Sequence, residues 1–284
     1  LFLIFKYAYD ITKENKFLFS GGVAMNSAAV SKCSKLKFIH ELNIPPSPGD
    51  SGAAIGAAYY GFINKKNESS DNFISKNNIL NNLFPGQQKS NEDFFELAFD
   101  KIADNKTSLV KAAELIAGNE IVATCYGNIE TGPRALGHRS LICNAHNSQL
   151  IKKLSTEIKK RNLFRPTAPV VLKEYAEKYF YLEKSLTNCY FHMASTALPK
   201  AGVSDNIKGV IHVDNSSRIQ ICDDTQLLGK ILNNLRKFNI YLIANTSFNI
   251  SSDPMVYDKE DAFLAVERMN IKHLLTENGL YRKK

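Results

Sequence analysis

Residues 120–140, EIVATCYGNIETGPRALGHRS, pass from an apolar run directly into a glycine-rich turn that carries two arginines. The run 120–127 has the length and composition of a buried strand, and its last residue is a glycine that favours a turn. Arg134 and Arg139 are framed by Gly-Pro and Ala-Leu-Gly, which is unusual for arginines that only solubilise a surface. Guanidinium groups bind phosphate or carboxylate with two parallel hydrogen bonds. The stretch therefore predicts a strand that ends in an anion-binding turn.

The chain beyond this stretch alternates helical and extended patterns, which predicts a mixed α/β fold. Apolar residues at i, i+3 and i+4 indicate helices, and short apolar runs bounded by turn residues indicate strands. The expected helices cover 91–104, 108–119, 146–162, 224–238 and 258–270, and a further helix is expected to begin near residue 172. The expected strands cover 120–127, 189–194, 209–221, 240–250 and 273–282.

The first 65 residues show a second strand-to-helix pattern. A short strand over 16–20 leads into Gly21 and Gly22, and a helix follows; this geometry lets a phosphate approach a helix N-terminus, although a bare glycine pair is more often a tight turn. A further strand is expected at 37–40 and a helix at 51–62. Asp50 or Ser51 would cap that helix, and Asp50 taken alone fits a cap better than a ligand.

Further cations and polar groups follow in the C-terminal region. Lys159, Arg161 and Arg165 lie within 30 residues of the arginine turn, and Arg218 comes later; several cations suit a site for two phosphorylated compounds, whereas isolated ones suit a solvated surface. The strand at 240–250 ends in Asn-Thr-Ser-Phe-Asn, which fits either a nucleotide or acyl site or a turn with Asx bonds. Glu130 could order an arginine or hold Mg²⁺, and His138 or His212 could serve as acid or base.

Composition sets the outer limits. The 284 residues carry a net charge of +8, which suits a phosphate-bearing partner but also a merely soluble surface. Five scattered cysteines without CxxC spacing disfavour a disulfide scaffold or a zinc-cysteine site and predict a cytoplasmic protein. No apolar run reaches the roughly 18 residues that cross a bilayer, so no membrane partner is expected. The chain starts with Leu1, without signal-peptide features, and we expect its natural N-terminus to lie upstream.

Six motifs together give a resemblance to a known family. They are FSGGVAMN (19–26), PPSPGDSGAAIGAA (45–58), GNIETGPRALGHRS (127–140), KKRNLFRPTAP (159–169), HVDNSSRIQ (212–220) and ANTSFN (244–249). In this order the chain resembles the O-carbamoyltransferases of the nodulation-factor and antibiotic-biosynthesis type. The resemblance implies the C-terminal piece of an actin/Hsp70-like (ASKHA) domain over 1–65, a linker over 66–91 and a YrdC-like α/β domain over 92–284.

The resemblance also implies an activity. The YrdC-like domain of such enzymes takes carbamoyl phosphate and ATP, with Mg²⁺, and makes carbamoyl adenylate. The actin-like domain transfers the carbamoyl group to a hydroxyl of a sugar-like or secondary-metabolite acceptor, beside an Fe²⁺-type metal.

The family's functional residues carry over onto matching positions here. Lys159 and Arg161 match a phosphate-holding Lys-x-Arg pair, and Ser247 and Asn249 match a Ser-x-Asn pair. Arginines that would surround the carbamoyl phosphate and triphosphate as catalytic residues are Arg134, Arg139 and Arg218. The turn that would receive the nucleotide in the actin-like domain contains Gly21, Gly22 and Asn26. Asp50 matches a metal-binding aspartate.

Departures from the family keep other hypotheses open. The N-terminal lobe, with its paired metal-binding histidines, is absent from this sequence, and one carboxylate cannot make a tight transition-metal site. We therefore expect carbamoyl transfer to need that lobe, which a separate chain could supply as a partner. An RNA-binding YrdC-like protein is one alternative, although nucleic acid is disfavoured by the lack of aromatic-basic interleaving. A non-catalytic remnant of a split gene is the other.

Overall fold

A computed structural model describes residues 1–66, 84, 86, 98–162, 165, 167–186, 188–250 and 253–284. The chain divides into two compact units. Unit 1 contains Leu1–Pro85, Thr131–Arg134 and Leu182–Thr196, and unit 2 contains Gly86–Glu130, Ala135–Tyr181 and Ala197–Lys284. The predicted C-terminal domain therefore contributes two short segments to unit 1. Apart from residues 66, 84 and 86, the predicted linker lies outside the described residues.

The described residues of unit 1 form a small parallel sheet and three α-helices. Strand β1 (Lys16–Leu18) pairs in parallel with β2 (Glu41–Asn43). The helices are α1 (Phe2–Thr12), α2 (Ser27–Cys33) and α3 (Asp50–Lys66), and a 3-10 turn covers Gly22–Met25. Phe5 of α1 is buried in edge-to-face contact with Phe17 and Phe19, at ring-centroid distances of 5.3 and 5.4 Å, and anchors this helix to β1.

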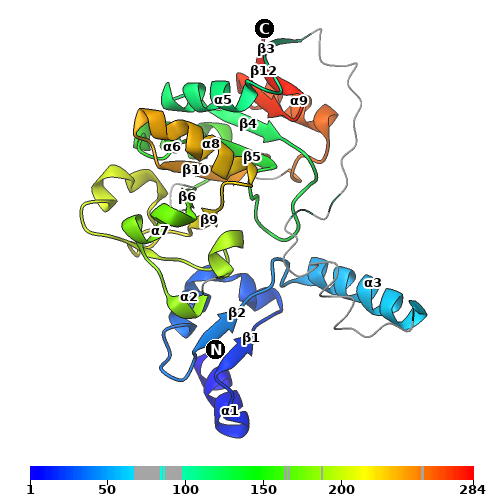
Figure 1. Ribbon diagram of the computed structural model, residues 1–284, viewed down its shortest axis with the longest axis vertical. Helices are drawn as coiled ribbons and strands as arrows, with labels where there is room; N and C mark the ends of the chain where they lie inside the picture. The colour runs from blue at the N-terminus through cyan, green and yellow to red at the C-terminus, as the bar shows by residue number, and fades with distance from the viewer. Residues whose placement is uncertain are drawn as a thin grey trace. The chain divides into compact units, whose positions relative to one another are not determined.

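Unit 2 is built on one large sheet (Figure 1). Within the described residues it has eight strands in the order β3-β12-β11-β4-β5-β10-β6-β9. The strands are β3 (Phe99–Asp104), β4 (Val122–Cys125), β5 (Arg139–Asn144), β6 (Ala168–Leu172), β9 (Gln220–Cys222), β10 (Leu242–Ser247), β11 (His273–Thr276) and β12 (Gly279–Lys283). The pairs β11·β4 and β6·β9 are parallel and the others antiparallel, so the sheet is mixed.

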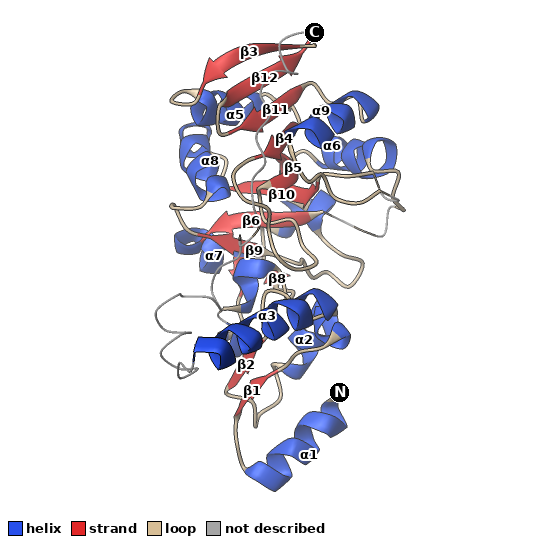
Figure 2. Cartoon of the chain, turned by 90° about the vertical axis from the view of Figure 1, so that its right-hand side faces the viewer, coloured by secondary structure: helices blue, strands red, loops and turns tan. Residues whose placement is uncertain are grey.

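Helices cover both faces of this sheet. Figure 2 shows α5 (Ser108–Ala117), α7 (Lys173–Tyr179) and α8 (Leu227–Leu235) on one side, with α6 (Ser148–Lys153) and α9 (Lys259–Arg268) on the other. A short pair, β7 (Phe180–Tyr181) with β8 (Leu198–Pro199), lies outside the large sheet. The mixed α/β class expected from the sequence is confirmed.

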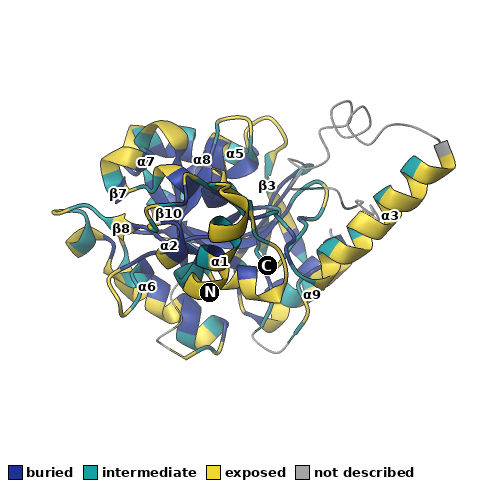
Figure 3. Cartoon of the chain, turned by 90° about the horizontal axis from the view of Figure 1, so that it is seen from below, coloured by how far each residue is buried: buried dark blue, intermediate teal, exposed yellow. Residues whose placement is uncertain are grey.

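The main core lies between the sheet and the pair α5 and α8. Ile116, Ile231 and Leu235 from these helices are fully buried against Val122 and Ile243 from the strands. Each such side chain contributes about 1.5–3 kcal/mol through removal from water. Figure 3 shows the contrast between the buried strands and the mostly exposed helix α3. Among the described residues, no helix combines the length and the apolar character that a membrane span requires.

Several predicted elements need correction. The helix predicted over 91–104 is wrong in its second half, because Phe99–Asp104 is strand β3, paired with β12; residues 91–97 lie outside the described residues. The strand predicted over 189–194 is a 3-10 helix at Cys189–His192. The strand predicted over 209–221 is confined to β9 at its end, since the amide of His212 donates to the Ser216 carbonyl and closes a turn.

Two boundaries also differ. The strand expected at 37–40 forms later, as β2. The terminal segment 273–282 is a hairpin of two strands, β11 and β12, instead of one strand.

A buried cationic candidate site in unit 2

Lys159 is the centre of the candidate site. It follows α6 and a π-helical turn (Leu154–Ile158), and its side chain is fully buried. The ammonium nitrogen contacts the backbone carbonyls of Ser247 and Asn249. It also lies 2.6 Å from Asn249 Oδ1 and 3.3 Å from Ser247 Oγ. Four neutral oxygens at the end of β10 therefore surround this amine.

The guanidinium group of Arg161 donates hydrogen bonds to the same end of β10. Its Nη1 donates to Thr246 Oγ1 at 2.9 Å and its Nη2 to Ser247 Oγ at 3.1 Å. The Ser247 hydroxyl donates to Asn249 Oδ1 at 2.6 Å. The buried Nε of Arg161 has no acceptor among the described groups. The structure thus brings together the Lys-x-Arg and Ser-x-Asn pairs, which lie almost 90 residues apart in sequence; their role in binding stays a prediction.

The electrostatics of this cluster favour an anion. Within the part of the chain that the structure describes, no carboxylate pairs with Lys159, Arg161 or Arg165. Burial, together with the charges of Arg161 and Arg165, lowers the pKa of Lys159 to about 6. Burial and Arg165 also lower the pKa of Arg161. An anionic ligand would compensate these cations, because it supplies the negative charge that the protein does not.

A second feature beside the cluster is the Ala135–Arg139 loop, which leads into β5. Ser140 pairs with Ser247 across the sheet, and the Phe248 amide donates to the Arg139 carbonyl, so this loop adjoins the end of β10. One carboxylate oxygen of the buried Glu130 accepts three amides of the loop, from residues 136, 138 and 139, each at 2.9 Å. Glu130 therefore orders the loop through its backbone, whereas the sequence suggested that it orders an arginine side chain or a metal.

Side chains from three strands hold the carbonyls of this loop. Asn245 Nδ2 donates to the Ala135 carbonyl at 2.9 Å, Gln220 Nε2 to the Leu136 carbonyl at 3.0 Å, and Thr124 Oγ1 to the Gly137 carbonyl at 2.6 Å. Gly137 has φ +124°, a conformation that favours glycine, and an added Cβ would lie 2.6 Å from Leu228 Cγ. Hydrogen bonds to both its amides and its carbonyls thus hold the loop in one conformation.

Thr124→Val is expected to lower the free energy of unfolding by about 1–3 kcal/mol. The substitution keeps the shape but removes the donor to Gly137 and the acceptor at 2.9 Å for the Ser140 amide, which leaves buried polar groups unpaired. Urea unfolding measures the change, and Thr124→Ser, which keeps the hydroxyl, serves as the matched control. Equal stability of the Val variant and the wild type would show that these bonds contribute nothing net.

Arg139 is a positioning residue in this structure. Its side chain is buried; Nε donates to the Tyr257 carbonyl at 3.0 Å, and Nη1 donates to the carbonyls of Tyr126, Gly127 and His138 at 3.1–3.2 Å. These contacts tie β5 to the end of β4 and to the segment before α9. The predicted direct action of Arg139 on substrate stays a prediction.

A partly buried ion pair that sequence reasoning missed supports the backbone next to Arg139. Lys259 Nζ lies 2.7 Å from Glu277 Oε1, and Glu277 Oε2 accepts the Gly127 amide at 3.3 Å. Since Gly127 is also a carbonyl partner of Arg139, this pair fixes the backbone that holds the arginine. No local motif marks these two residues. For the loop contacts, Thr124, a polar residue in the middle of the apolar run 120–127, was a signal that could have been used.

The other two predicted arginines lie elsewhere. Arg134 belongs to unit 1, where its Nη2 donates to the Met25 carbonyl at 3.1 Å. Arg218 is half-buried in unit 2, two residues before β9. Burial lowers the pKa of His212, and the positive charge of Arg218 lowers it further. Burial likewise lowers the pKa of His138, whose Nδ1 lies 2.6 Å from the Asn128 carbonyl. Catalytic roles for these residues are untested.

The predicted residues of unit 1 have structural contacts. The Gly21 amide donates to the Pro48 carbonyl at 2.7 Å, and Gly22 begins the 3-10 turn. Asn26 caps α2, with its Oδ1 accepting the Ala29 amide at 3.1 Å. Asp50 is exposed and is the first residue of α3, where a carboxylate is favoured by the helix dipole. The described residues contain no group of three His, Cys, Asp or Glu that could hold a metal, so they do not fit an iron site.

Unit 2 is therefore a mixed α/β domain in which Lys159 and Arg161 lie against the end of β10, where the described residues supply no carboxylate partner. A family model described as Carbamoyltransferase C-terminus matches residues 113–283. The chain belongs to this carbamoyltransferase family, and the resemblance expected from the sequence is confirmed.

The chain is also similar to individual curated proteins and to a solved structure. The nodulation protein NolNO of Sinorhizobium fredii is 26% identical over 100% of this chain and 42% of its own length. The uncharacterized protein MJ1058 of Methanocaldococcus jannaschii is 31% identical over 97% of this chain and 46% of its own length. The chain thus spans about half the length of the curated relatives it matches. A crystal structure of full-length HypF in the phosphate- and nucleotide-bound form is 18% identical, with TM-score 0.46, over 62% of this chain and 25% of that one.

Proposed function

We propose that unit 2 activates a carbamoyl group by forming carbamoyl adenylate from carbamoyl phosphate and ATP. The observation that carries this proposal is the cluster of the buried Lys159 and the half-buried Arg161 on the Ser-x-Asn strand end, where the described residues supply no compensating carboxylate. Both proposed substrates are polyanions, and membership of the carbamoyltransferase family supports the carbamoyl group as the one transferred.

The residues of the cluster would have separate roles in this reaction. Lys159 and Arg161 would bind phosphate oxygens and stabilise the charge that develops on them, and Mg²⁺ would neutralise further charge on the triphosphate. Ser247 and Asn249, now hydrogen-bonded to each other and to Lys159, would orient the phosphates. Carbamoyl phosphate, ATP and one water would give carbamoyl adenylate, pyrophosphate and inorganic phosphate.

The transfer step would follow from the chemistry of that product. An acceptor hydroxyl oxygen would attack the carbamoyl carbon, the bond from this carbon to the AMP oxygen would break, and AMP would leave as the hydroxyl loses its proton. We propose a sugar-like or secondary-metabolite hydroxyl as the acceptor. We also propose that this step needs an N-terminal part beyond this chain, because the described residues contain no group of three His, Cys, Asp or Glu for a metal-assisted transfer.

The test is release of pyrophosphate by the purified chain. We expect release with ATP and carbamoyl phosphate together, and at most a few per cent of that rate when carbamoyl phosphate is omitted or replaced by acetyl phosphate. Lys152→Gln, an exposed charge change on α6, is expected to leave the rate unchanged. Release that does not depend on carbamoyl phosphate would contradict the proposal.

A further inference from the structure

The surroundings of the Lys159 amine hold it by hydrogen bonds but leave a positive charge on it uncompensated. The amine contacts the backbone carbonyls and side-chain oxygens of Ser247 and Asn249, which are all neutral. The guanidinium group of Arg161 donates to the same Ser247 hydroxyl, so a second cation lies at this strand end. Burial and neighbouring cations both favour the uncharged amine, in line with the lowered pKa of Lys159. An uncharged lysine amine carries a free lone pair and is a nucleophile.

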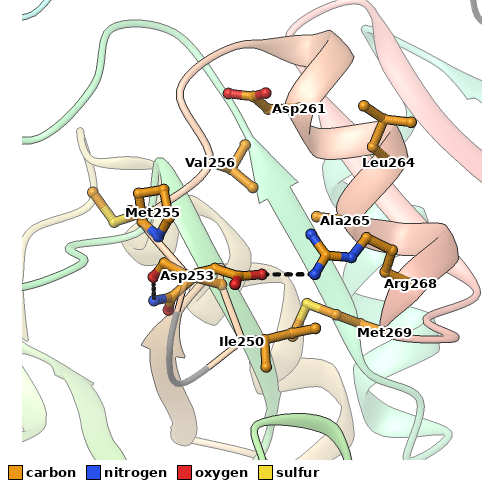
Figure 4. A pocket seen from close by; sticks show the side chains of 11 residues that line it. Ile250, Asp253, Met255, Val256, Asp261, Leu264, Ala265, Arg268 and Met269 are labelled. Carbon is orange, nitrogen blue, oxygen red and sulfur yellow. Dashed lines mark hydrogen bonds and ion pairs between the residues drawn. The ribbon is translucent and has the colours of Figure 1, made fainter.

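Asp253, in the loop after β10, directs its negative charge to another cation. The Asn249 Nδ2 donates to the Asp253 carbonyl at 2.7 Å, so the backbone of Asp253 supports the partner of Lys159. The Asp253 carboxylate, however, lies 3.1 Å from Arg268 Nη2 on α9, as the dashed line in Figure 4 shows. This carboxylate therefore does not compensate a charge on Lys159, and the amine keeps neutral partners.

The residues around the Lys159 amine are closer to solvent than the amine itself. The side chain of Lys159 is fully buried, whereas Arg161, Ser247 and Asn249 are half-buried. A reagent that reaches the amine past these residues without disturbing β10 has to be small. Isocyanic acid, HN=C=O, is a small, linear and uncharged molecule that carbamoylates amines, and it forms when carbamoyl phosphate decomposes in water.

We propose that Lys159 is a carbamoylation site, which isocyanic acid released from carbamoyl phosphate modifies. The lone pair of Nζ would attack the carbon of HN=C=O and form a new N–C bond. The C=N double bond of the reagent would become a single bond, and its nitrogen would take the proton that Nζ loses. The product is a ureido group on Lys159, without a leaving group or any further reactant. This inference rests on the proposed function for the source of the reagent.

The modification would inactivate the site, and bound phosphates would prevent it. A ureido group cannot take up a proton near neutral pH, so Lys159 would no longer offer a cation to a phosphate. Phosphate oxygens beside the amine favour its charged form, and an ammonium group has no lone pair with which to attack. The free chain should therefore be modified faster than the chain with bound phosphates, and decomposition of the proposed substrate becomes a route to self-inactivation.

The experiment treats the whole chain with potassium cyanate at pH 7 and measures carbamoylation of each lysine by mass spectrometry of its peptides. Lys159 should be modified at least about tenfold faster than the exposed Lys152 and Lys160, because lysine amines in water are protonated at this pH. Inorganic triphosphate with Mg²⁺ should slow modification of Lys159 at least about tenfold and leave the two exposed lysines unchanged. In guanidinium chloride the three rates should converge, because unfolding exposes all three amines.

The results separate this inference from the proposed function. Modification of Lys159 no faster than that of Lys152 and Lys160 would overturn the carbamoylation site and leave the proposed pyrophosphate release standing. A preference for Lys159 that persists in guanidinium chloride would also overturn it, because the cluster exists only in the folded chain. Fast modification of Lys159 that triphosphate does not slow would support the carbamoylation site and contradict the proposed binding of phosphates beside this amine.

Discussion

Replacing Lys159 by Met is expected to lower the rate of carbamoyl-phosphate-dependent pyrophosphate release at least about 100-fold. The amine is fully buried and has no described carboxylate partner, so a phosphate bound beside it would favour its charged form and accept its hydrogen bonds. Met retains the length of the side chain but can neither donate a hydrogen bond nor carry charge. The rate is measured at saturating ATP and carbamoyl phosphate, so that weaker binding alone does not account for the loss.

Two comparisons separate a lost phosphate contact from a damaged fold. Lys152→Gln removes a positive charge from an exposed position on α6 and should keep the full rate. The Met variant should still unfold cooperatively in urea, because loss of the desolvated amine offsets part of the cost of leaving the oxygens of Ser247 and Asn249 without this donor. A folded Lys159→Met variant with more than a third of the wild-type rate would exclude Lys159 from the activation step.

The fold was predictable where local pattern and tertiary contacts agree. Helices α5, α8 and α9 follow the apolar spacing of their sequences, and Asp258 caps α9 by accepting the Asp261 amide. Strand β3 was not predictable in this way. The segment around it has helical spacing, but its pairing partner is β12 at the far end of the chain, and register with that partner decides its conformation. Local propensity is a weak guide when a partner strand is so distant.

The candidate site shows the same limit. The sequence could identify the Lys-x-Arg and Ser-x-Asn pairs only through motifs and resemblance, because almost 90 residues separate them and only the order of β10 beside β5 and β6 brings them together. Residue type alone also could not show that Arg134 and Arg139 have different surroundings. Arg139 is framed by the same glycine-rich turn as Arg134, yet it is buried among carbonyls of unit 2, whereas Arg134 contacts Met25 in unit 1.

The low pKa of Lys159 should make both stability and ligand binding depend on pH. Its pKa is about 6 in the folded chain, against an ordinary value of 10.5, so between these values the unfolded chain binds one proton more than the folded chain. The free energy of unfolding should therefore rise with pH across this window, by about 1.4 kcal/mol per pH unit from this group. The contribution of Lys159 to this slope should vanish below pH 6, where both states carry the proton. Urea unfolding at pH 7 and 8 measures the slope, and Lys159→Met should lack this part of it.

Binding of an anion should reverse the depression of the Lys159 pKa. Phosphate oxygens near the amine favour its charged form, so at pH 8 the complex should take up close to one proton that the free chain lacks. Titration with inorganic triphosphate in two buffers of different ionisation enthalpy measures this uptake. Lys152→Gln should retain this proton uptake, because Lys152 is exposed and is not part of the cationic cluster. Lys159→Met should bind without it. A wild type that binds triphosphate at pH 8 with no proton uptake would mean that Lys159 is already charged in the free chain, and then the same slope of stability with pH should appear in both the wild type and Lys159→Met.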